Sequence, residues 1–426
     1  MRSIPIRMML VLWAASGSAL QVGGAEDLAP PQQDPWPQWR GPNRDAISPE
    51  TGLLHTWPEG GPRLLWKADG LGIGFSTPSL TRRAIYVMGN RDEGEWIFAL
   101  DPRDEGRLVW KYRVGEVRHG GSGYPGPRST PTCDGDRVYA LGINGDLVCL
   151  SAARGQLLWQ RNLVDDFGGR VPNWGYSESV LIDGPTLICT PGGDEATIVA
   201  LDKYSGELVW KSAFGDGAGY ASVIRAELPP EPQYVQFTAR GVVGVAARDG
   251  RLLWRYDAPA NGTANCSTPL WSGQSVFAAS GYGTGGGRVE IAGAGSTASA
   301  DEAFFTNQMK NHHGGIVVVD GFLYGSNDPG LLTCLDFETG EVQWRDRACG
   351  KCSVAFADGM IFARSQEGTV SLVEATPEEF RLRGQFEQPD RSAEPSWPHP
   401  VVAAGCLYLR DQQLLFCYDV SDPAAR

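Results

Sequence analysis

Six of the fourteen tryptophans in this chain end the same short phrase, in which two residues such as Leu-Leu or Leu-Val precede the indole. They are Trp66, Trp110, Trp159, Trp210, Trp254 and Trp344. The first five lie 44 to 51 residues apart, and the sixth follows after 90 residues, which equals two repeats with one tryptophan replaced. Self-similarity at this period is typical of propellers and solenoids, in which each repeat buries its faces against its neighbours. The repeat therefore indicates the fold before any local pattern is considered.

Two further signals recur within each repeat. Glycine stands four residues before five of the tryptophans, at Gly106, Gly155, Gly206, Gly250 and Gly340, and an Ala-Leu-Asp-like phrase ends at Asp101, Asp202, Asp336 and Asp419. Aspartate accepts hydrogen bonds from the amides of a turn, and glycine allows the positive φ that such turns require. Each repeat is therefore predicted to contain an inner strand, its hairpin partner, a third strand ending near the aspartate and an outer strand ending in tryptophan. The indole is expected to fill the gap between adjacent units.

The inner strands can be counted without the tryptophans. Eight segments qualify, starting near Ser76, Ser129, Ser177, Ala221, Ser267, Gly315, Ser353 and Pro400. Outer strands end at the six tryptophans and at Phe386, whereas the fifth repeat has no tryptophan and its outer part falls in the Gly-rich stretch 283–300, where a loop insertion is expected. These counts predict an all-β, eight-bladed β-propeller of four-stranded antiparallel blades.

The two ends of the repeat region are predicted to complete one another. The chain enters the repeats with an outer strand, residues 63–68, and leaves them with three strands that lack one. Pairing of Trp66 with residues 414–418 would make a composite blade, close the ring and remove free sheet edges. The expected organisation is a signal peptide over 1–25, a non-repeat lead-in over 26–60 packed along the flank, the propeller over 61–420 and a tail over 421–426.

The N-terminus has the pattern of a secretory signal. Arg2 and Arg7 precede an apolar run over residues 8–15, and small residues follow through Ala25. The run is too short to span a bilayer, and the absence of cysteine before Cys133 argues against a lipid anchor. The expected product is exported to the periplasm or the exterior, soluble, monomeric and not a lipoprotein. A net charge of −13 argues against nucleic acid or an anionic membrane as a partner.

Nine cysteines in an exported chain allow two readings. Most lie in predicted strands, where cysteine serves as a small buried hydrophobe. Cys349 and Cys352 have the spacing of a redox motif, but they lie in a loop between blades rather than at the start of a helix, which leaves a local disulfide as the alternative. An odd count leaves at least one free thiol unless the chain pairs with another.

The repeat resembles that of the pyrroloquinoline-quinone (PQQ) propeller family, whose blades carry an Ala-x-Asp-x-x-x-Gly-x-x-x-Trp-like phrase and number eight. The resemblance covers residues 36–420. The segments 36–42 (Trp-Pro-Gln-Trp-Arg-Gly-Pro), 123–128 (Gly-Tyr-Pro-Gly-Pro-Arg) and 173–178 (Asn-Trp-Gly-Tyr-Ser-Glu) look like exported proteins of planctomycete-type bacteria. Such proteins are described as distant relatives of the outer-membrane assembly factor BamB. The name refers to a repeat, and a fold does not imply a function.

The resemblance includes quinoprotein alcohol dehydrogenases, which hold PQQ between a tryptophan floor and a disulfide of two adjacent cysteines. In those enzymes a calcium ion polarises the quinone and an aspartate serves as base. This chain has no adjacent cysteine pair, and Ser353 after Cys352 excludes a Cys-x-x-Cys-His haem site. The chain also lacks the long loops that cover the cofactor in those enzymes. No cofactor is therefore expected, and PQQ with calcium in a quinoprotein oxidoreductase remains the alternative.

Candidate ligand-binding residues cluster in the loops that precede inner strands. All inner strands of a propeller run in one direction, so these loops share one face around the central channel, a natural place for a pocket. The candidates combine imidazole, carboxylate and exposed aromatic groups, as sugar sites do. They are His119, Tyr124, Arg128, Asn173, Trp174, Tyr176, Glu178, Tyr220, Asn265, His312, His313 and His399. The alternative is that these side chains plug the channel and bind loop backbones.

Neither a metal site nor a catalytic residue is predicted. Adjacent His312 and His313 point apart in extended backbone, and no Gly-x-Ser-x-Gly elbow marks a nucleophilic serine. The expected function is that of an exported, non-catalytic binding or scaffold module in the cell envelope. Its partner would be an envelope protein or a small polar ligand such as a sugar.

Overall fold

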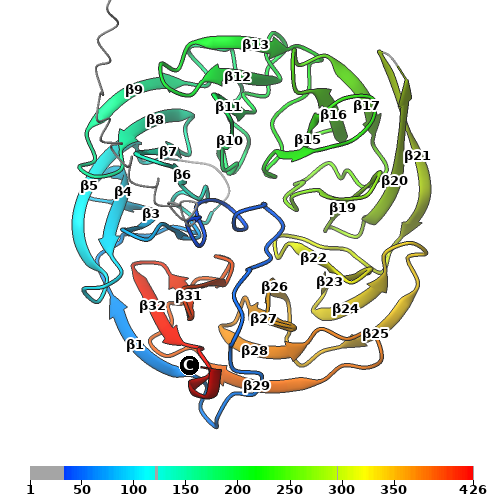
Figure 1. Ribbon diagram of the computed structural model, residues 1–426. Helices are drawn as coiled ribbons and strands as arrows, with labels where there is room; N and C mark the ends of the chain where they lie inside the picture. The colour runs from blue at the N-terminus through cyan, green and yellow to red at the C-terminus, as the bar shows by residue number, and fades with distance from the viewer. Residues whose placement is uncertain (1–32, 120–122, 295, 426) are drawn as a thin grey trace, which may run out of the picture. The chain divides into compact units, whose positions relative to one another are not determined.

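A computed structural model describes residues 33–119, 123–294 and 296–425 of the chain. The expected signal peptide lies outside these residues. The described residues form eight antiparallel four-stranded sheets arranged as blades around a ring, which confirms the predicted propeller (Figure 1). A short 3₁₀ turn, η1 (Pro423–Ala425), follows the last strand.

The first four blades follow one another in chain order, each with its inner strand first. Blade 1 contains β2 (Ser79–Leu80), β3 (Ile85–Arg91), β4 (Gly94–Asp101) and β5 (Arg107–Glu116). Blade 2 contains β6 (Thr132–Asp134), β7 (Arg137–Leu141), β8 (Asp146–Ser151) and β9 (Leu157–Asn162). Blade 3 contains β10 (Leu181–Asp183), β11 (Thr186–Cys189), β12 (Ile198–Asp202) and β13 (Leu208–Ser212). Blade 4 contains β14 (Ile224–Ala226), β15 (Gln233–Phe237), β16 (Val242–Ala246) and β17 (Leu252–Tyr256).

The remaining blades continue this order until the last, which takes its outer strand from the start of the chain. Blade 5 contains β18 (Leu270–Ser272), β19 (Ser275–Ser280), β20 (Gly285–Ala294) and β21 (Thr297–Thr306). Blade 6 contains β22 (Ile316–Val319), β23 (Phe322–Asn327), β24 (Leu331–Asp336) and β25 (Val342–Asp346). Blade 7 contains β26 (Cys352–Ala357), β27 (Met360–Ser365), β28 (Thr369–Glu374) and β29 (Leu382–Glu387). Blade 8 contains β30 (Val401–Ala403), β31 (Cys406–Asp411), β32 (Leu414–Asp419) and β1 (Arg63–Ala68).

Ring closure follows the predicted register. β1 pairs antiparallel with β32, and Trp66 lies opposite Cys417. Because β1 covers the edge of β32, blade 8 is as complete as the other blades and the two ends of the repeat region hold each other in place.

The indoles of Trp110, Trp159, Trp210 and Trp344 each donate a hydrogen bond to a carbonyl of the next blade and so join adjacent blades. In blade 3 the indole of Trp210 donates a hydrogen bond from Nε1 to the carbonyl of Ala247 in blade 4, 3.2 Å away. The repeat glycine makes room for the preceding indole: Gly206 has a φ of +71°, and a Cβ placed on it would lie 2.8 Å from the ring of Trp159. A bulge just before Trp210 shifts the register of β13 and aims the indole at this gap. The strand continues two residues past the tryptophan to Ser212, whereas the repeat pattern predicted that it ends there.

Blade 5 departs from the prediction. The Gly-rich stretch is not a loop insertion: β20 and β21 form a long hairpin that includes it. Phe304 occupies the tryptophan position, because it lies opposite Arg288 next to the same kind of bulge. Its ring lies where a Cβ on Gly340 would be, 2.6 Å from the nearest ring carbon. Phe304, a smaller aromatic residue, therefore fills the gap between blades 5 and 6. The count of repeats missed Phe304 because the extended hairpin changes the spacing along the chain.

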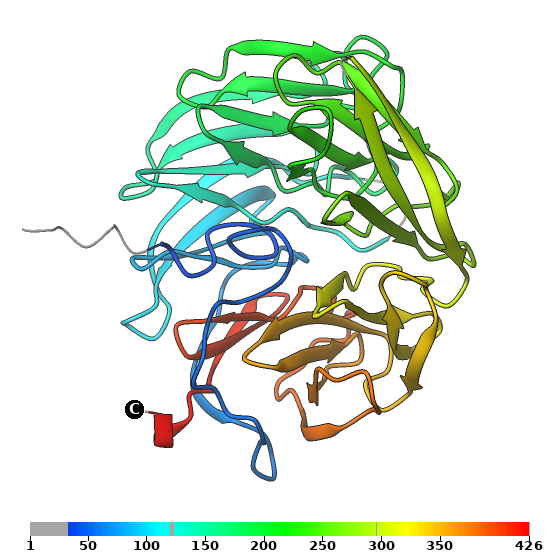
Figure 2. The ribbon, with the colours of Figure 1, turned by 45° about the vertical axis from the view of Figure 1, so that its right-hand side comes forward.

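The lead-in has two parts, of which the first crosses the centre of the ring instead of packing along its flank and the second runs outward past blades 7 and 8. Residues 34–48 are the dark blue segment at the centre in Figures 1 and 2, whereas farther along the amide of Leu54 donates to the carbonyl of Val420 and the amide of Trp57 donates to that of Arg383. Trp36 forms a bridge with Leu80 in blade 1, and Ile47 forms a parallel bridge with Phe356 in blade 7. Asp34 lies at the turn between β2 and β3, where it accepts a hydrogen bond from the amide of Arg82. The segment thus enters the channel from the face that carries the hairpins of the inner strands, here called the lower face.

Two buried arginines anchor the lead-in inside the channel. Arg44 donates to the carbonyls of Ser179 (2.6 Å) and Val180 (3.0 Å) beside blade 3. Arg40 donates to the carbonyl of Ile316 in blade 6. Burial lowers the pKa of each guanidinium to about 10, which still leaves both charged at neutral pH. The lead-in is therefore a stopper whose charged side chains satisfy backbone carbonyls on opposite sides of the ring.

Candidate functional site

Above this stopper, the channel widens into a cavity of about 380 Å³ on the opposite, upper face. Its size lies within the range of small-molecule sites, and seven of its nineteen lining residues are phenylalanine, tyrosine or tryptophan. The aromatic side chains are Trp39, Phe75, Tyr124, Trp174, Tyr220, Tyr282 and Trp397. The polar side chains include Arg128, Cys266, His312, His313, Lys351, Gln366 and His399. We call this space the axial cavity.

Trp397 is the centre of the aromatic wall. Its ring centroid lies 4.5 Å from that of Tyr124, 4.9 Å from that of Phe75 and 5.1 Å from that of His313, all in tilted arrangements. Across the lining, Trp174 and Tyr220 meet edge to face at 5.6 Å. Tilted and edge-to-face pairs are favourable for aromatic quadrupoles, so the wall is packed into a fixed shape before any ligand arrives.

Trp39 of the lead-in also lines the cavity. Its indole Nε1 donates to Thr268 Oγ1 at 2.9 Å, and its ring lies 4.5 Å from the imidazole of His399. The same segment that closes the channel from the lower face thus contributes a flat aromatic surface to the site.

Burial keeps the three cavity histidines neutral at pH 7. The pKa of His312 is lowered to about 4 and that of His399 to about 3, and the pKa of His313 falls well below its usual value. His399 Nε2 lies 2.8 Å from the carbonyl of His313, so this nitrogen carries the proton. His312 Nδ1 lies 2.9 Å from the ammonium of Lys351 and therefore accepts. The imidazoles of His312 and His399 therefore act as hydrogen-bonding groups of fixed tautomer.

The charged side chains in the lining are both cations. Arg128 donates from Nη1 to the carbonyl of Trp174 (2.8 Å) and from Nη2 to that of Tyr124 (2.7 Å). Lys351 pairs with Asp328 at 2.8 Å, just outside the lining. Burial raises the pKa of Glu95, a carboxyl that influences Arg128 through space, to about 8. Since Glu95 is largely protonated at pH 7, it does not neutralise Arg128.

The axial cavity brings together seven of the twelve residues proposed from sequence: Tyr124, Arg128, Trp174, Tyr220, His312, His313 and His399. The other five lie elsewhere. His119 is exposed on the rim, 3.8 Å from Glu93. Asn173 and Asn265 line a separate hollow near the loop over blade 4.

Tyr176 and Glu178 lie within the protein core and not in the axial cavity. The hydroxyl of Tyr176 donates to the carbonyl of Pro191 at 2.7 Å. The carboxyl of Glu178 accepts from the amide of Thr190 (2.7 Å) and from Gln236 Nε2 (3.2 Å), and it thereby ties blade 3 to blade 4. Burial raises its pKa to about 7. Both residues precede an inner strand, but their side chains turn away from the channel.

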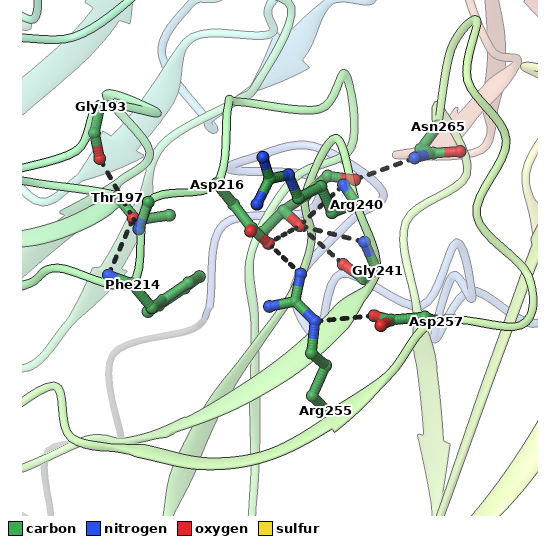
Figure 3. Close-up of polar contacts among 11 residues, drawn as sticks. Gly193, Thr197, Phe214, Asp216, Arg240, Gly241, Arg255, Asp257 and Asn265 are labelled. Atoms are coloured by element: carbon green, nitrogen blue, oxygen red, sulfur yellow. Dashed lines mark hydrogen bonds and ion pairs between the residues drawn. The ribbon is translucent and has the colours of Figure 1, made fainter.

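Asn265 belongs to a structural network between blades 3 and 4 (Figure 3). Its Nδ2 donates to the carbonyl of Thr238 at 3.0 Å, and the Thr238 hydroxyl donates to the buried carboxylate of Asp216 at 2.6 Å. Asp216 also pairs with Arg255 at 2.6 Å. The hydroxyl of Thr238 and the buried carboxylate of Asp216 both have protein partners, so the network holds the loops together.

Four further lining residues could have been predicted from their position in the sequence. Phe75 and Trp397 lie just before inner strands, as the chosen candidates do. Tyr282 and Gln366 lie between the second and third strands of their blades, and antiparallel alternation returns those loops to the upper face. Trp39 could not be predicted as a lining residue, because nothing in the repeat shows that the lead-in enters the channel.

The residues around the axial cavity do not suit PQQ with calcium. Calcium takes six to eight oxygen ligands, with carboxylates prominent among them, whereas the charged groups lining the cavity are Arg128 and Lys351. Within residues 33–119, 123–294 and 296–425, no three histidine, cysteine, aspartate or glutamate side chains gather as a metal-binding group. All nine cysteines are free thiols, and Cys349 and Cys352 are buried in one apolar cluster between blades 6 and 7.

No helix in the described part of the chain is both long and apolar enough to cross a bilayer.

Comparison with known proteins finds similarity to BamB proteins. An outer membrane protein assembly factor BamB from Yersinia pestis is 24% identical over 253 residues, which is 56% of this chain and 60% of that protein. The aligned part therefore spans less than two thirds of this relative. The crystal structure of BamB from Moraxella catarrhalis superposes with a TM-score of 0.58 at 15% identity, covering 84% of this chain and 97% of that one.

The same fold occurs in an enzyme. A quinohemoprotein alcohol dehydrogenase from Pseudomonas putida HK5 superposes with a TM-score of 0.61 at 14% identity, over 91% of this chain and 80% of that one. At such identities the likeness concerns the fold alone. The family profile described as outer membrane protein assembly factor BamB matches residues 57–346, more than half of the chain. This chain belongs to the BamB family of PQQ-repeat propellers.

Proposed function

We propose that this protein is an exported, non-catalytic β-propeller that binds a small polar ligand in the axial cavity and serves as a binding module of the cell envelope. One observation carries the proposal. The axial cavity of about 380 Å³ is walled by packed aromatic rings and holds a few converging polar groups, among them Arg128, His312 and Lys351, which is the composition of a small-molecule site.

The chemistry of the lining favours binding over catalysis. The histidines are neutral at pH 7, and the pKa values of His312 and His399 lie far below those that suit acid–base catalysis near neutrality. Burial raises the pKa of the Cys266 thiol to about 12, so it stays protonated and is a poor nucleophile. We therefore assign the polar groups of the cavity to recognition.

The family supports a role in the envelope. Its members are named as assembly factors for outer membrane proteins, and a stoppered propeller offers an envelope partner a rigid surface. A quinoprotein oxidoreductase that uses the same cavity is the second candidate, favoured by the shared fold of the Pseudomonas putida enzyme. The described residues that line the axial cavity include no aspartate or glutamate that could hold the calcium ion, which counts against this second candidate.

Thermal unfolding in the presence of ligands tests both functions. The purified chain is mixed separately with galactose, galacturonate, and PQQ plus calcium, and dye reduction by ethanol is followed in the last mixture. A ligand at a hundred times its Kd should stabilise the folded state by about 2.7 kcal/mol. The shift should disappear in His313→Phe and persist in Trp271→Phe, a control at a tryptophan outside the cavity.

The outcomes separate the candidates. A shift caused by a sugar, without dye reduction, supports the binding module. Dye reduction that depends on PQQ would replace it with the oxidoreductase. No shift with any of these probes, or a shift unaltered in His313→Phe, would overturn the assignment of the axial cavity.

A further inference from the structure

One side chain of the axial cavity, Arg128, keeps hydrogen-bond donors that no protein group uses. Its Nη1 donates to the carbonyls of Gly126 (3.3 Å) and Trp174 (2.8 Å), and its Nη2 donates to that of Tyr124 (2.7 Å). A guanidinium has five N–H donors, so the Nε–H and one N–H of Nη2 remain without a partner among the described residues. Arg128 lines the cavity and is partly exposed, and its Nε is not fully buried. The edge of the guanidinium formed by Nε and Nη2 is therefore open to a ligand, and such an edge matches the two oxygens of a carboxylate.

The charge of Arg128 has no counter-ion among the described residues. Burial raises the pKa of Glu95, whose carboxyl acts on Arg128 through space, to about 8, so Glu95 is largely protonated at pH 7. The other cation in the lining, Lys351, pairs with Asp328 at 2.8 Å, and its charge is thereby balanced. The cavity thus holds one unbalanced positive charge, which a ligand with a single negative charge would neutralise.

Open aromatic surface adjoins this cation. Tyr124 and Tyr282 line the cavity and remain 42% and 48% exposed. Tyr124 is held by contacts with Trp397 and Phe75 at centroid distances of 4.5 and 6.2 Å. The guanidinium of Arg128 lies 5.7 Å from the centre of the Phe75 ring, so the apolar wall begins beside the charge. A ligand that carries a ring next to its acid group would cover this surface while its acid group reaches Arg128.

We propose that the axial cavity selects a small monocarboxylate that carries a ring, and that Arg128 determines this specificity; the inference rests on the binding function proposed above. The carboxylate pairs with the Nε–H and the free Nη2–H of Arg128, and the ring packs against Tyr124 and its aromatic neighbours. Sugar acids and aromatic acids share this chemistry, and the experiment distinguishes them.

Calorimetric titration of the full chain with matched acids and neutral ligands tests the charge requirement. The pairs are galacturonate with galactose, and benzoate with benzamide. In each pair the acid should bind about tenfold more tightly or better, because only the acid forms charged hydrogen bonds with Arg128. The tighter of the two acids shows whether the cavity prefers a sugar ring or an aromatic ring. Phthalate places a second carboxylate beside the first and should bind more weakly than benzoate by about threefold or more, since the second charge finds no cation.

Two variants test the role of Arg128. Arg128→Gln should weaken the binding of both acids about tenfold or more and leave galactose and benzamide within about threefold, whereas Arg128→Lys should retain part of the preference for acids. Arg154→Gln removes an exposed arginine outside the cavity and should change none of these affinities. Because Arg128 also bonds to three carbonyls, the comparison of acids with neutral ligands on the unaltered chain tests the charge even if a variant folds poorly.

Each outcome bears on a different part of the proposal. Equal affinities within both pairs would overturn the specificity for acids while leaving the binding function intact. A preference for acids that persists unaltered in Arg128→Gln would overturn the role of Arg128. Tighter binding of phthalate than of benzoate would overturn the restriction to one negative charge. The absence of binding by all five ligands would overturn both this inference and the proposed function.

Discussion

At the scale of single residues, burial decides which ionisable groups carry charge around the channel. Glu95 and Glu178 have raised pKa values because desolvation penalises the carboxylate, and the histidines have lowered values because it penalises the imidazolium. Burial lowers the pKa of Arg128, but Arg128 keeps its charge because a guanidinium stays protonated in proteins. The cavity is therefore cationic although the chain as a whole carries a charge of −13.

The raised pKa of Glu95 makes stability depend on pH. Below about pH 4.5 the carboxyl is protonated in both folded and unfolded states; between pH 4.5 and 8 the unfolded chain releases the proton and the folded chain keeps it. The free energy of unfolding then falls as pH rises, by at most about 1.4 kcal/mol per pH unit. Glu95→Gln keeps an acceptor for the amide of Ile143, so it should match wild type at pH 4.5 and be more stable at pH 8.5.

Urea unfolding at both pH values checks this. The difference between variant and wild type isolates Glu95 from the histidines, whose lowered pKa values act in the opposite direction. Exposed Glu207 provides the control, and Glu207→Gln should track wild type. Parallel pH profiles for Glu95→Gln and wild type would show that Glu95 is already ionised in the folded state.

Tryptophans packed between blades should contribute more to the free energy of unfolding than tryptophans that line the cavity. Trp210 packs against Tyr234 and Gly250 and bonds to Ala247, so Trp210→Ala should cost about 3 to 5 kcal/mol. Trp174→Ala should cost far less, because its indole faces the cavity. Denaturant titration measures both values, and equal costs would contradict the division into the two groups.

At the scale of elements, the lead-in is a stopper with charged anchors. Its non-glycine residues Arg40, Arg44 and Ala46 have φ values of 61° to 63°, a conformation that costs free energy and persists only where surrounding contacts hold it. Those contacts are the arginine–carbonyl bonds and the bridges to Leu80 and Phe356. The strain of the segment thus offsets part of the stability that its anchors provide.

Loss of one anchor should be costly. Arg44→Ala leaves the carbonyls of Ser179 and Val180 without their charged donor, and hydrogen bonds to charged groups are worth roughly 1.5 to 3 kcal/mol each. We expect a loss of about 3 kcal/mol in urea unfolding. Arg63→Ala removes an exposed ion pair with Asp419 and should cost less than about 1 kcal/mol. Similar costs for the two variants would show that the anchor does not hold the stopper.

At the scale of the whole molecule, the composite blade joins the two ends of the repeat region. Each blade packs only against its neighbours, so an incomplete blade would expose both a sheet edge and an apolar face. In this ring the short strand β1 prevents that exposure by covering β32.

Removal of β1 should therefore cause association. Deletion of residues 61–70 uncovers the edge of β32, and light scattering after size-exclusion chromatography should detect aggregates rather than a slightly destabilised monomer. Truncation after Asp422 removes only the terminal turn and serves as the control. A monomeric deletion product with the wild-type melting temperature would refute the closure argument.

The amino-acid sequence by itself determined the number of blades, their strand order and the pairing of Trp66 with the last blade. Those features follow from local chemistry that recurs at a fixed spacing: aspartate and glycine make the same turn wherever they occur, and tryptophan fills the same gap. Asp202 and Asp336 both accept hydrogen bonds from turn amides as the pattern predicts. Repetition makes such local rules readable without coordinates.

Only the tertiary structure decided which loop side chains meet. Glu178 and His313 both precede inner strands, yet one turns between blades and the other faces the channel, because the path of each loop depends on the blade beside it. The stopper and Phe304 were likewise hidden, since Arg40 and Arg44 have partners distant in sequence and the hairpin of blade 5 is longer than its repeat. Side chains converge across a ring through contacts between distant segments, and no spacing along the chain encodes those contacts.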